Sequence, residues 1–148
     1  MEIPKYITLL ILVIVLQSCG VTMVNSGSDF DKSEITEVEF CRLNNYQGQL
    51  IKTTLEYSGM EEYWGARGFE DCDLNNEVDL NFEEFYENER DYLIDPQLRR
   101  LYNNYPTHKA IMTVIGVFNK DTINGFGHLN SYPAEILVKS VRIKVKHK

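Results

Sequence analysis

The sequence predicts a mainly β protein whose folded part is a small five-stranded barrel, with one short helix between strands 3 and 4. Five segments carry strand patterns, either alternating apolar and polar residues or a continuous β-branched run. One further segment repeats apolar residues at helical spacing. The chain has 148 residues, and removing a leader and a tether leaves residues 35–148, a usual size for one domain.

The first half of this domain carries a hairpin and a third strand. Apolar residues alternate with polar ones over residues 49–57, a Ser-Gly turn follows, and residues 60–67 return as a second, weaker strand. Residues 78–82 alternate again and form the third strand. Asp79 and Glu83 give this strand an acidic outer face.

The second half carries the helix and two strands. Asp95-Pro96 predicts an N-cap and a first-turn proline, and the apolar residues that follow, up to Tyr105, recur at helical spacing. Residues 110–118 are nearly all apolar and predict a central strand buried on both faces. Residues 141–146 alternate aliphatic and basic side chains. Three strands, a helix and two strands is the order of an OB-fold, a five-stranded Greek-key barrel.

In an OB-fold the third strand lies beside the fifth. We therefore expect the acidic face of Asp79 and Glu83 to meet the basic face of Arg142 and Lys144 as cross-strand ion pairs. The alternative use of these cations is a patch for an anionic lipid or polymer.

The first 18 residues, 1–18, have the anatomy of a signal peptide. Lys5 precedes an almost wholly apolar run over residues 6–16, which is short of the roughly 20 residues that a spanning helix needs. Residues 16–19, Leu-Gln-Ser-Cys, resemble the bacterial lipobox. This resemblance implies that the sulfur of Cys19 is lipidated and that fatty acyl chains such as palmitate anchor the mature protein. The alternative is an ordinary signal peptide with a chance Cys near its end.

Residues 19–34 follow the leader and are rich in small and polar types, which predicts a flexible tether behind the lipidated Cys. In lipoproteins of bacteria with two membranes, an Asp directly after the Cys tends to hold the protein in the inner membrane. Gly20 stands there, so the resemblance implies an envelope protein at the outer membrane, facing the periplasm. Its first partner would be the membrane, through the lipid.

Charge and cysteine usage narrow the function classes. The net charge of −7 argues against nucleic acid as a partner, because phosphate-backbone binding depends on Lys and Arg. Outside the lipobox, Cys41 and Cys72 remain in an oxidising compartment, where we expect a disulfide closing a loop of about 30 residues. The alternative is two buried free thiols.

Several short stretches resemble a family of small bacterial exported lipoproteins with an OB-fold-like domain. They are Cys41-Arg42-Leu43, residues 46–51 (Tyr-Gln-Gly-Gln-Leu-Ile), Cys72, Gly125-Phe126-Gly127-His128-Leu129 and Tyr132. The resemblance spans most of the domain and implies the OB-like core. It implies no particular activity.

A candidate ligand loop joins the last two strands, where OB-folds usually bind. Gly125 and Gly127 permit close backbone approach, and His128 and Tyr132 offer a titratable or stacking contact. The alternative is that the glycines meet turn geometry and His128 bonds a loop carbonyl.

We find no catalytic residue set, metal site or cofactor motif. The chain lacks a serine elbow, an HExxH helix, a paired Cys and His, and a phosphate loop. Residues 71–79 alternate oxygen ligands as a calcium loop does, but Phe82 stands where the bidentate Glu is needed. We interpret that segment as a polar turn running into a strand.

These observations predict a membrane-anchored envelope lipoprotein whose domain is a non-enzymatic binding or structural module for an envelope protein or glycan. The alternative is an envelope hydrolase or inhibitor with its site near the Gly125–Tyr132 loop. A third hypothesis is a carrier of a small ligand or metal.

Overall fold

The computed structural model describes residues 23–69 and 78–148 of the chain. It is mainly β, with a seven-stranded sheet curled into a half-barrel. The strands are β1 (Val24–Asn25), β2 (Thr36–Glu37), β3 (Leu50–Met60), β4 (Tyr63–Arg67), β5 (Asp79–Asn81), β6 (His108–Lys120) and β7 (Ala134–His147). The helices are α2 (Glu83–Glu87) and α3 (Asp95–Asn103), with short 3-10 turns η1 (Lys32–Glu34), η2 (Phe40–Asn45), η3 (Asp91–Leu93) and η4 (His128–Asn130).

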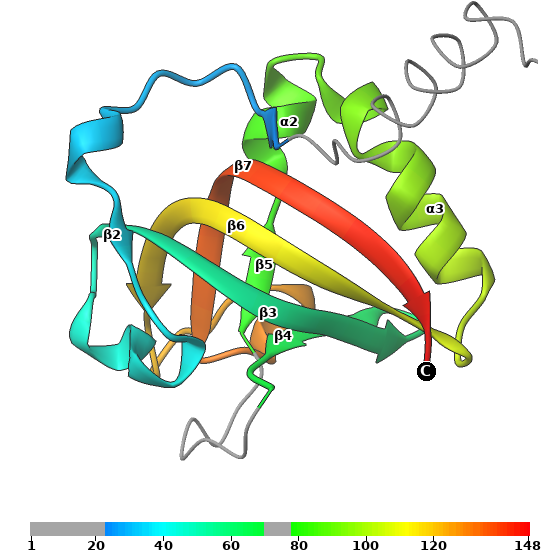
Figure 1. The fold of residues 1–148 in the computed structure, drawn as a ribbon. Helices are drawn as coiled ribbons and strands as arrows, with labels where there is room; N and C mark the ends of the chain where they lie inside the picture. The colour runs from blue at the N-terminus through cyan, green and yellow to red at the C-terminus, as the bar shows by residue number, and fades with distance from the viewer. Residues whose placement is uncertain (1–22, 70–77) are drawn as a thin grey trace, which may run out of the picture.

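Three long antiparallel strands, β3, β6 and β7, form the body of the sheet and cross the molecule side by side (Figure 1). Their inward-facing residues line up across the sheet. For example, Leu55 of β3 lies opposite Met112 of β6, which lies opposite Ile143 of β7. All three are buried, and each such aliphatic side chain contributes about 1.5 to 3 kcal/mol by leaving water. The predicted strands over residues 49–57, 110–118 and 141–146 are confirmed.

Two short strands connect the two edges of this body. β4 returns antiparallel along β3, as the predicted hairpin. Ala66 and Val78 then exchange backbone hydrogen bonds of 2.8 and 2.9 Å, and β5 runs parallel to the start of β7. The pairings therefore run in a circuit from β3 through β4, β5, β7 and β6 back to β3.

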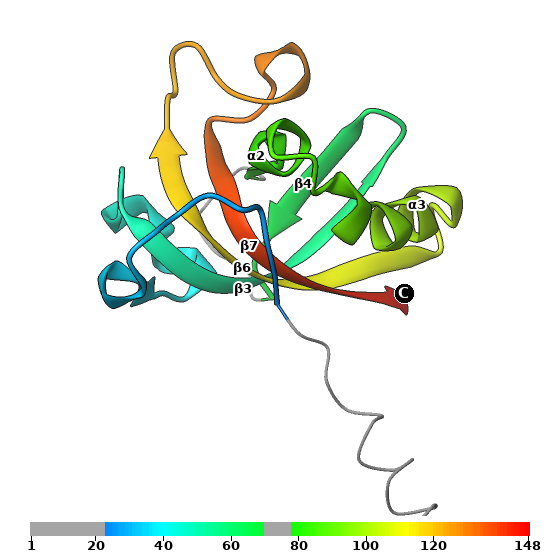
Figure 2. The ribbon, with the colours of Figure 1, turned by 90° about the horizontal axis from the view of Figure 1, so that it is seen from above.

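The helices cover the concave face of the curled sheet, which Figure 2 shows from above. Phe85 of α2 and Leu98 and Leu101 of α3 are buried in the core that the sheet encloses. The predicted helix is confirmed as α3, but its N-cap is Ile94, and Asp95 pairs with Arg99 one turn along. No helix in the described parts of the chain is long and apolar enough to cross a membrane.

The strand and helix numbers differ from the expected five and one. All five predicted strands are present as β3 to β7, and β1, β2 and α2 are additional. β1 and β2 have two residues each, too few to leave a period in the sequence. The third strand ends at Asn81, because Phe82 turns the chain into α2.

Part of the expected tether belongs to the folded domain. Val24 lies opposite Val141 of β7 and packs against the core, and the Ser140 hydroxyl donates to the Val24 carbonyl at 2.9 Å. The folded domain thus includes residues well before residue 35. The predicted leader, 1–18, and Cys19 lie outside the described residues.

The expected match between acidic and basic strand faces is wrong. β5 does lie beside β7, but Asp79 stands opposite Glu135, near the beginning of β7. Arg142, farther along, donates instead to the Thr113 hydroxyl at 3.0 Å, and Glu83 belongs to α2. The prediction that the third strand lies beside the fifth is confirmed by the pairing of β5 with β7. Which residues stand opposite one another depends on the length and curl of β7.

Candidate functional site

The edge of β3 is uncovered over a short stretch. β2 pairs with β3 up to Lys52, and β4 pairs with it from Glu56 onward. Among the described residues, no strand pairs with positions 53–55 on this side. The Val38 N–H donates to the Lys52 carbonyl at 2.9 Å. Peptide groups two residues apart point to the same edge, so the N–H and C=O of Thr54 also face this gap.

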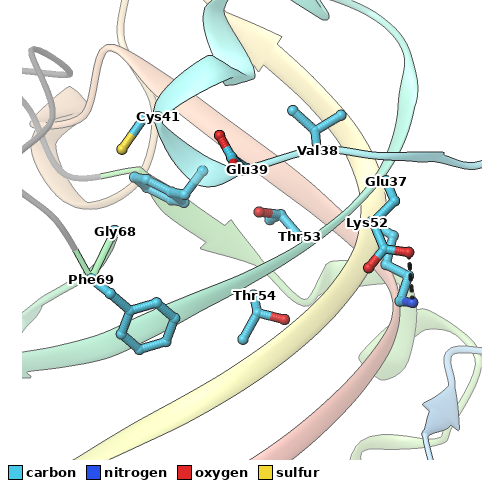
Figure 3. A pocket seen from close by; sticks show the side chains of 10 residues that line it. Glu37, Val38, Glu39, Cys41, Lys52, Thr53, Thr54, Gly68 and Phe69 are labelled. Atoms are coloured by element: carbon cyan, nitrogen blue, oxygen red, sulfur yellow. Dashed lines mark hydrogen bonds and ion pairs between the residues drawn. The ribbon is translucent and has the colours of Figure 1, made fainter.

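A cavity of about 410 Å³ opens at the same place (Figure 3). It is lined by residues 37–41, 52–54 and 68–69. These come from β2 and the start of η2, from the gap in β3, and from the chain leaving β4. Ligand pockets commonly measure about 300 to 1,000 Å³, so this groove is large enough for a small ligand or a short segment of chain.

A buried hydroxyl at the groove has no partner. Thr53 lines the groove and lies between Ile51 and Leu55 in the inward-facing row of β3. It is only 2 % exposed, and its Oγ1 has no hydrogen-bond partner within the described residues. A buried polar group left unpaired costs about 1 to 3 kcal/mol. Such groups are rare in folded proteins and call for a specific explanation.

The rim of the groove is charged but balanced. Lys52 pairs with Glu37 at 3.2 Å, and Arg42 pairs with Glu39 at 3.3 Å. Phe69 adds an aromatic ring that is 60 % exposed. The groove therefore offers peptide groups, a hydroxyl and an apolar surface, with no net charge from these four side chains.

The predicted ligand loop lies elsewhere. Gly125 and Gly127 adopt positive φ angles of 71° and 68°, as turn geometry requires. His128 Nε2 pairs with Glu62 Oε2 at 3.1 Å and its ring meets the Tyr63 ring edge-on at 5.5 Å. The loop is thus folded onto the turn between β3 and β4, and none of its residues lines the groove.

Tyr132, the fourth predicted contact residue of that loop, is 6 % exposed. It pairs with Phe126 through backbone hydrogen bonds of 2.7 and 3.1 Å. A Cβ on Gly127 would meet the Tyr132 ring at 2.6 Å, so this glycine allows the loop to close over the ring. Within the described residues no cluster of three or more metal-ligating side chains forms here or elsewhere.

Two carboxylates meet where β5 joins β7. Asn81 and Asn119 donate to the Glu135 carboxylate at 3.2 and 3.3 Å. Burial disfavours the charged form of neighbouring Asp79, and the Glu135 charge adds to this, so the pKa of Asp79 is raised to about 6. The sequence contained both residues but did not predict that they would meet.

Of the two cysteines predicted to form a disulfide, the structure describes only Cys41. Cys41 is the second residue of η2 and lines the groove, and it has a bonded partner in the structure. Cys72 lies outside the described residues, as does most of the calcium-like segment 71–79. The pairing of Cys41 with Cys72 therefore stays a prediction.

The groove was missed by sequence reasoning. One signal was present, a threonine at the centre of the apolar row of the first predicted strand. The gap itself left no signal, because it depends on where β2 and β4 end along β3.

Comparisons with known proteins add no relative. A scan against protein-family models finds no match, and searches of curated proteins and of solved structures find none either. The resemblance to small exported lipoproteins consequently stays a prediction.

Proposed function

We propose that this chain is a lipid-anchored protein of the bacterial cell envelope whose domain is a binding module that uses the groove beside β3. The observation that carries the binding function is the coincidence of an uncovered strand edge and an unpartnered buried hydroxyl at one cavity. Both are hydrogen-bonding groups that a ligand can complete. The anchor rests on the lipobox-like residues before Cys19.

We further infer that the circuit of paired strands is an OB-like barrel. Its order β3–β4–β5–β7–β6, the parallel pair between β5 and β7, and α3 between β5 and β6 support this. OB-folds usually bind on the face between the loop after the first strand and the loop before the last. Here His128 and Glu62 join those two loops, which favours the groove at the opposite end of β4, where Gly68 and Phe69 follow the strand, as the binding place.

The anchor is tested by lipid labelling. Growth with labelled palmitate should label the wild-type protein and place it in the membrane fraction, because two or three acyl chains hold a protein firmly on a bilayer. Cys19→Ser should lose both the label and the membrane association. Ser18→Ala keeps a small residue before the cysteine and should keep both. Membrane association of an unlabelled Cys19→Ser protein would contradict the anchor.

The groove is tested by photo-crosslinking in cells. A photoreactive phenylalanine analogue at Phe69, on the groove, should crosslink an envelope component. The same analogue at Tyr92, which is 66 % exposed and does not line the groove, is the matched control and should crosslink none. Equal crosslinking at both positions, or none at Phe69, would contradict binding at the groove.

A further inference from the structure

We propose that the ligand of the groove is an extended polypeptide segment. Its main chain would form hydrogen bonds with the N–H and C=O of Thr54 at the edge of β3, and one of its polar side chains would form a hydrogen bond with the Thr53 hydroxyl. This inference rests on the proposed binding function and specifies its ligand class. Addition of an extended segment to an exposed sheet edge is a recurring mode of peptide recognition.

The gap has the dimensions of a short strand segment. From Lys52 to Glu56 the chain advances four residues, about 13 Å at roughly 3.3 Å per residue. β2 and β4 both lie on the side of β3 away from β6. A segment of about three residues placed between them would complete that row of strands, and its central residue would pair with the N–H and C=O of Thr54, which no strand in the described parts of the chain bonds on this side.

Thr53 adds a chemical preference. Side chains alternate between the two faces of a strand, so the ligand residue beside Thr53 would direct its side chain toward the same interior side. The Thr53 hydroxyl is buried, and in the part of the chain that the structure describes it has no hydrogen-bond partner. A ligand residue with a hydroxyl or amide there would supply the missing hydrogen bond, whereas an aliphatic one would leave it unmade.

The rim argues against a charged polymer. The ion pairs of Glu37 with Lys52 and of Glu39 with Arg42 leave these four side chains neutral in sum. Binding should therefore depend little on salt, unlike binding of a polyanion. A glycan lacks the alternating N–H and C=O groups that the Thr54 edge would pair with, so the peptide is the better match.

The experiment selects random heptapeptides by phage display against the full-length chain in detergent, and then measures the affinity of synthetic copies. We expect one peptide N–H to be essential, so that N-methylation of that residue weakens binding at least tenfold while N-methylation of its neighbours does not. Thr53→Val should weaken binding about fivefold, equivalent to one hydrogen bond. Raising NaCl from about 50 to 500 mM should change affinity less than about threefold.

The matched control is Ser58→Ala. Ser58 is also a buried hydroxyl residue of β3, but there β4 covers the edge, so its loss should leave peptide affinity unchanged. Peptides that tolerate N-methylation at every residue, or that bind Thr53→Val as well as the wild type, would overturn the edge geometry.

The ligand class is tested separately with chitotetraose. If it binds at the groove and protects Phe69 from crosslinking while no peptide is selected, the peptide assignment fails and the binding function stands. If neither probe binds and Phe69 crosslinks nothing in cells, both fail.

Discussion

A threonine occupies the centre of the apolar row on β3. Ile51 and Leu55 on either side are fully buried, and Thr53 between them is nearly so. Thr113, on the neighbouring strand, is also buried but well bonded. Its hydroxyl shares a hydrogen bond of 3.1 Å with Thr54 and accepts one of 3.0 Å from Arg142. In the unliganded protein, the Thr53 hydroxyl therefore lowers the stability of the fold, whereas the Thr113 hydroxyl raises it.

We expect Thr53→Val to raise the free energy of unfolding by about 1 kcal/mol, because it removes a buried hydroxyl that has no partner. Thr113→Val should lower it by about 1 kcal/mol, since two bonded partners are left behind. Urea denaturation of both variants measures this. Equal destabilisation of the two would mean that the Thr53 hydroxyl has a partner, and would remove it from the binding argument.

At the scale of the elements, α2 depends on tertiary contacts. Its five residues are too few for a stable isolated helix. Phe85 anchors it in the core, and Glu84 joins Lys139 of β7 at 2.5 Å, with both side chains only 15 to 16 % exposed. Burial by itself would raise the pKa of Glu84, but hydrogen bonds, chiefly from Lys139, outweigh it and the pKa is lowered.

We expect Lys139→Met to lower the free energy of unfolding by about 2 kcal/mol, because it leaves the partly buried Glu84 charge without its cation. Arg99→Met breaks the pair with Asp95, whose cation is 76 % exposed, and should cost less than about 0.5 kcal/mol. Thermal unfolding compares them. Adding Glu84→Gln to Lys139→Met should recover part of the loss, and a loss equal to that of Arg99→Met would contradict a stabilising pair between Glu84 and Lys139.

At the scale of the whole molecule, closing the strand circuit brings two acids together. The parallel pairing of β5 with β7 sets Asp79 beside Glu135, and burial with this second charge raises the pKa of Asp79 to about 6 from an ordinary 3.8. Between about pH 4 and 6, the unfolded chain releases the Asp79 proton more readily than the folded protein does. The contribution of Asp79 to stability therefore falls as pH rises from about 4 to 6 and is constant above.

We expect Asp79→Asn to match the wild type in stability below about pH 4 and to exceed it by about 1 kcal/mol above pH 6, after allowance for solvent screening. Asp121→Asn is the control of opposite sign. Hydrogen bonds from Asn124 and Ile123 lower the pKa of Asp121, so that variant should lose stability at neutral pH. Urea melts across the pH range measure both. A pH-independent gain for Asp79→Asn would exclude titration as the cause.

The sequence by itself determined the long elements. β3 and β7 carry period-two patterns, β6 carries a continuous apolar run, and α3 carries apolar residues at helical spacing. Each of these patterns arises because the apolar residues are the ones that the element buries. The same local patterns gave the order of these elements along the chain. The turn geometry of Gly125 and Gly127, which was the alternative expectation to a ligand loop, is confirmed by their positive φ angles.

Only the tertiary structure decided the groove, the carboxylate pair and the partner of Lys139. Each depends on where one strand ends, or starts, against another far away in the chain. A strand's pattern shows which face is buried, but the position of its neighbours depends on strand length, curl and the bulge between β6 and β7. For this reason the Thr53 hydroxyl could be placed in the core from the sequence, while the absence of its partner could not.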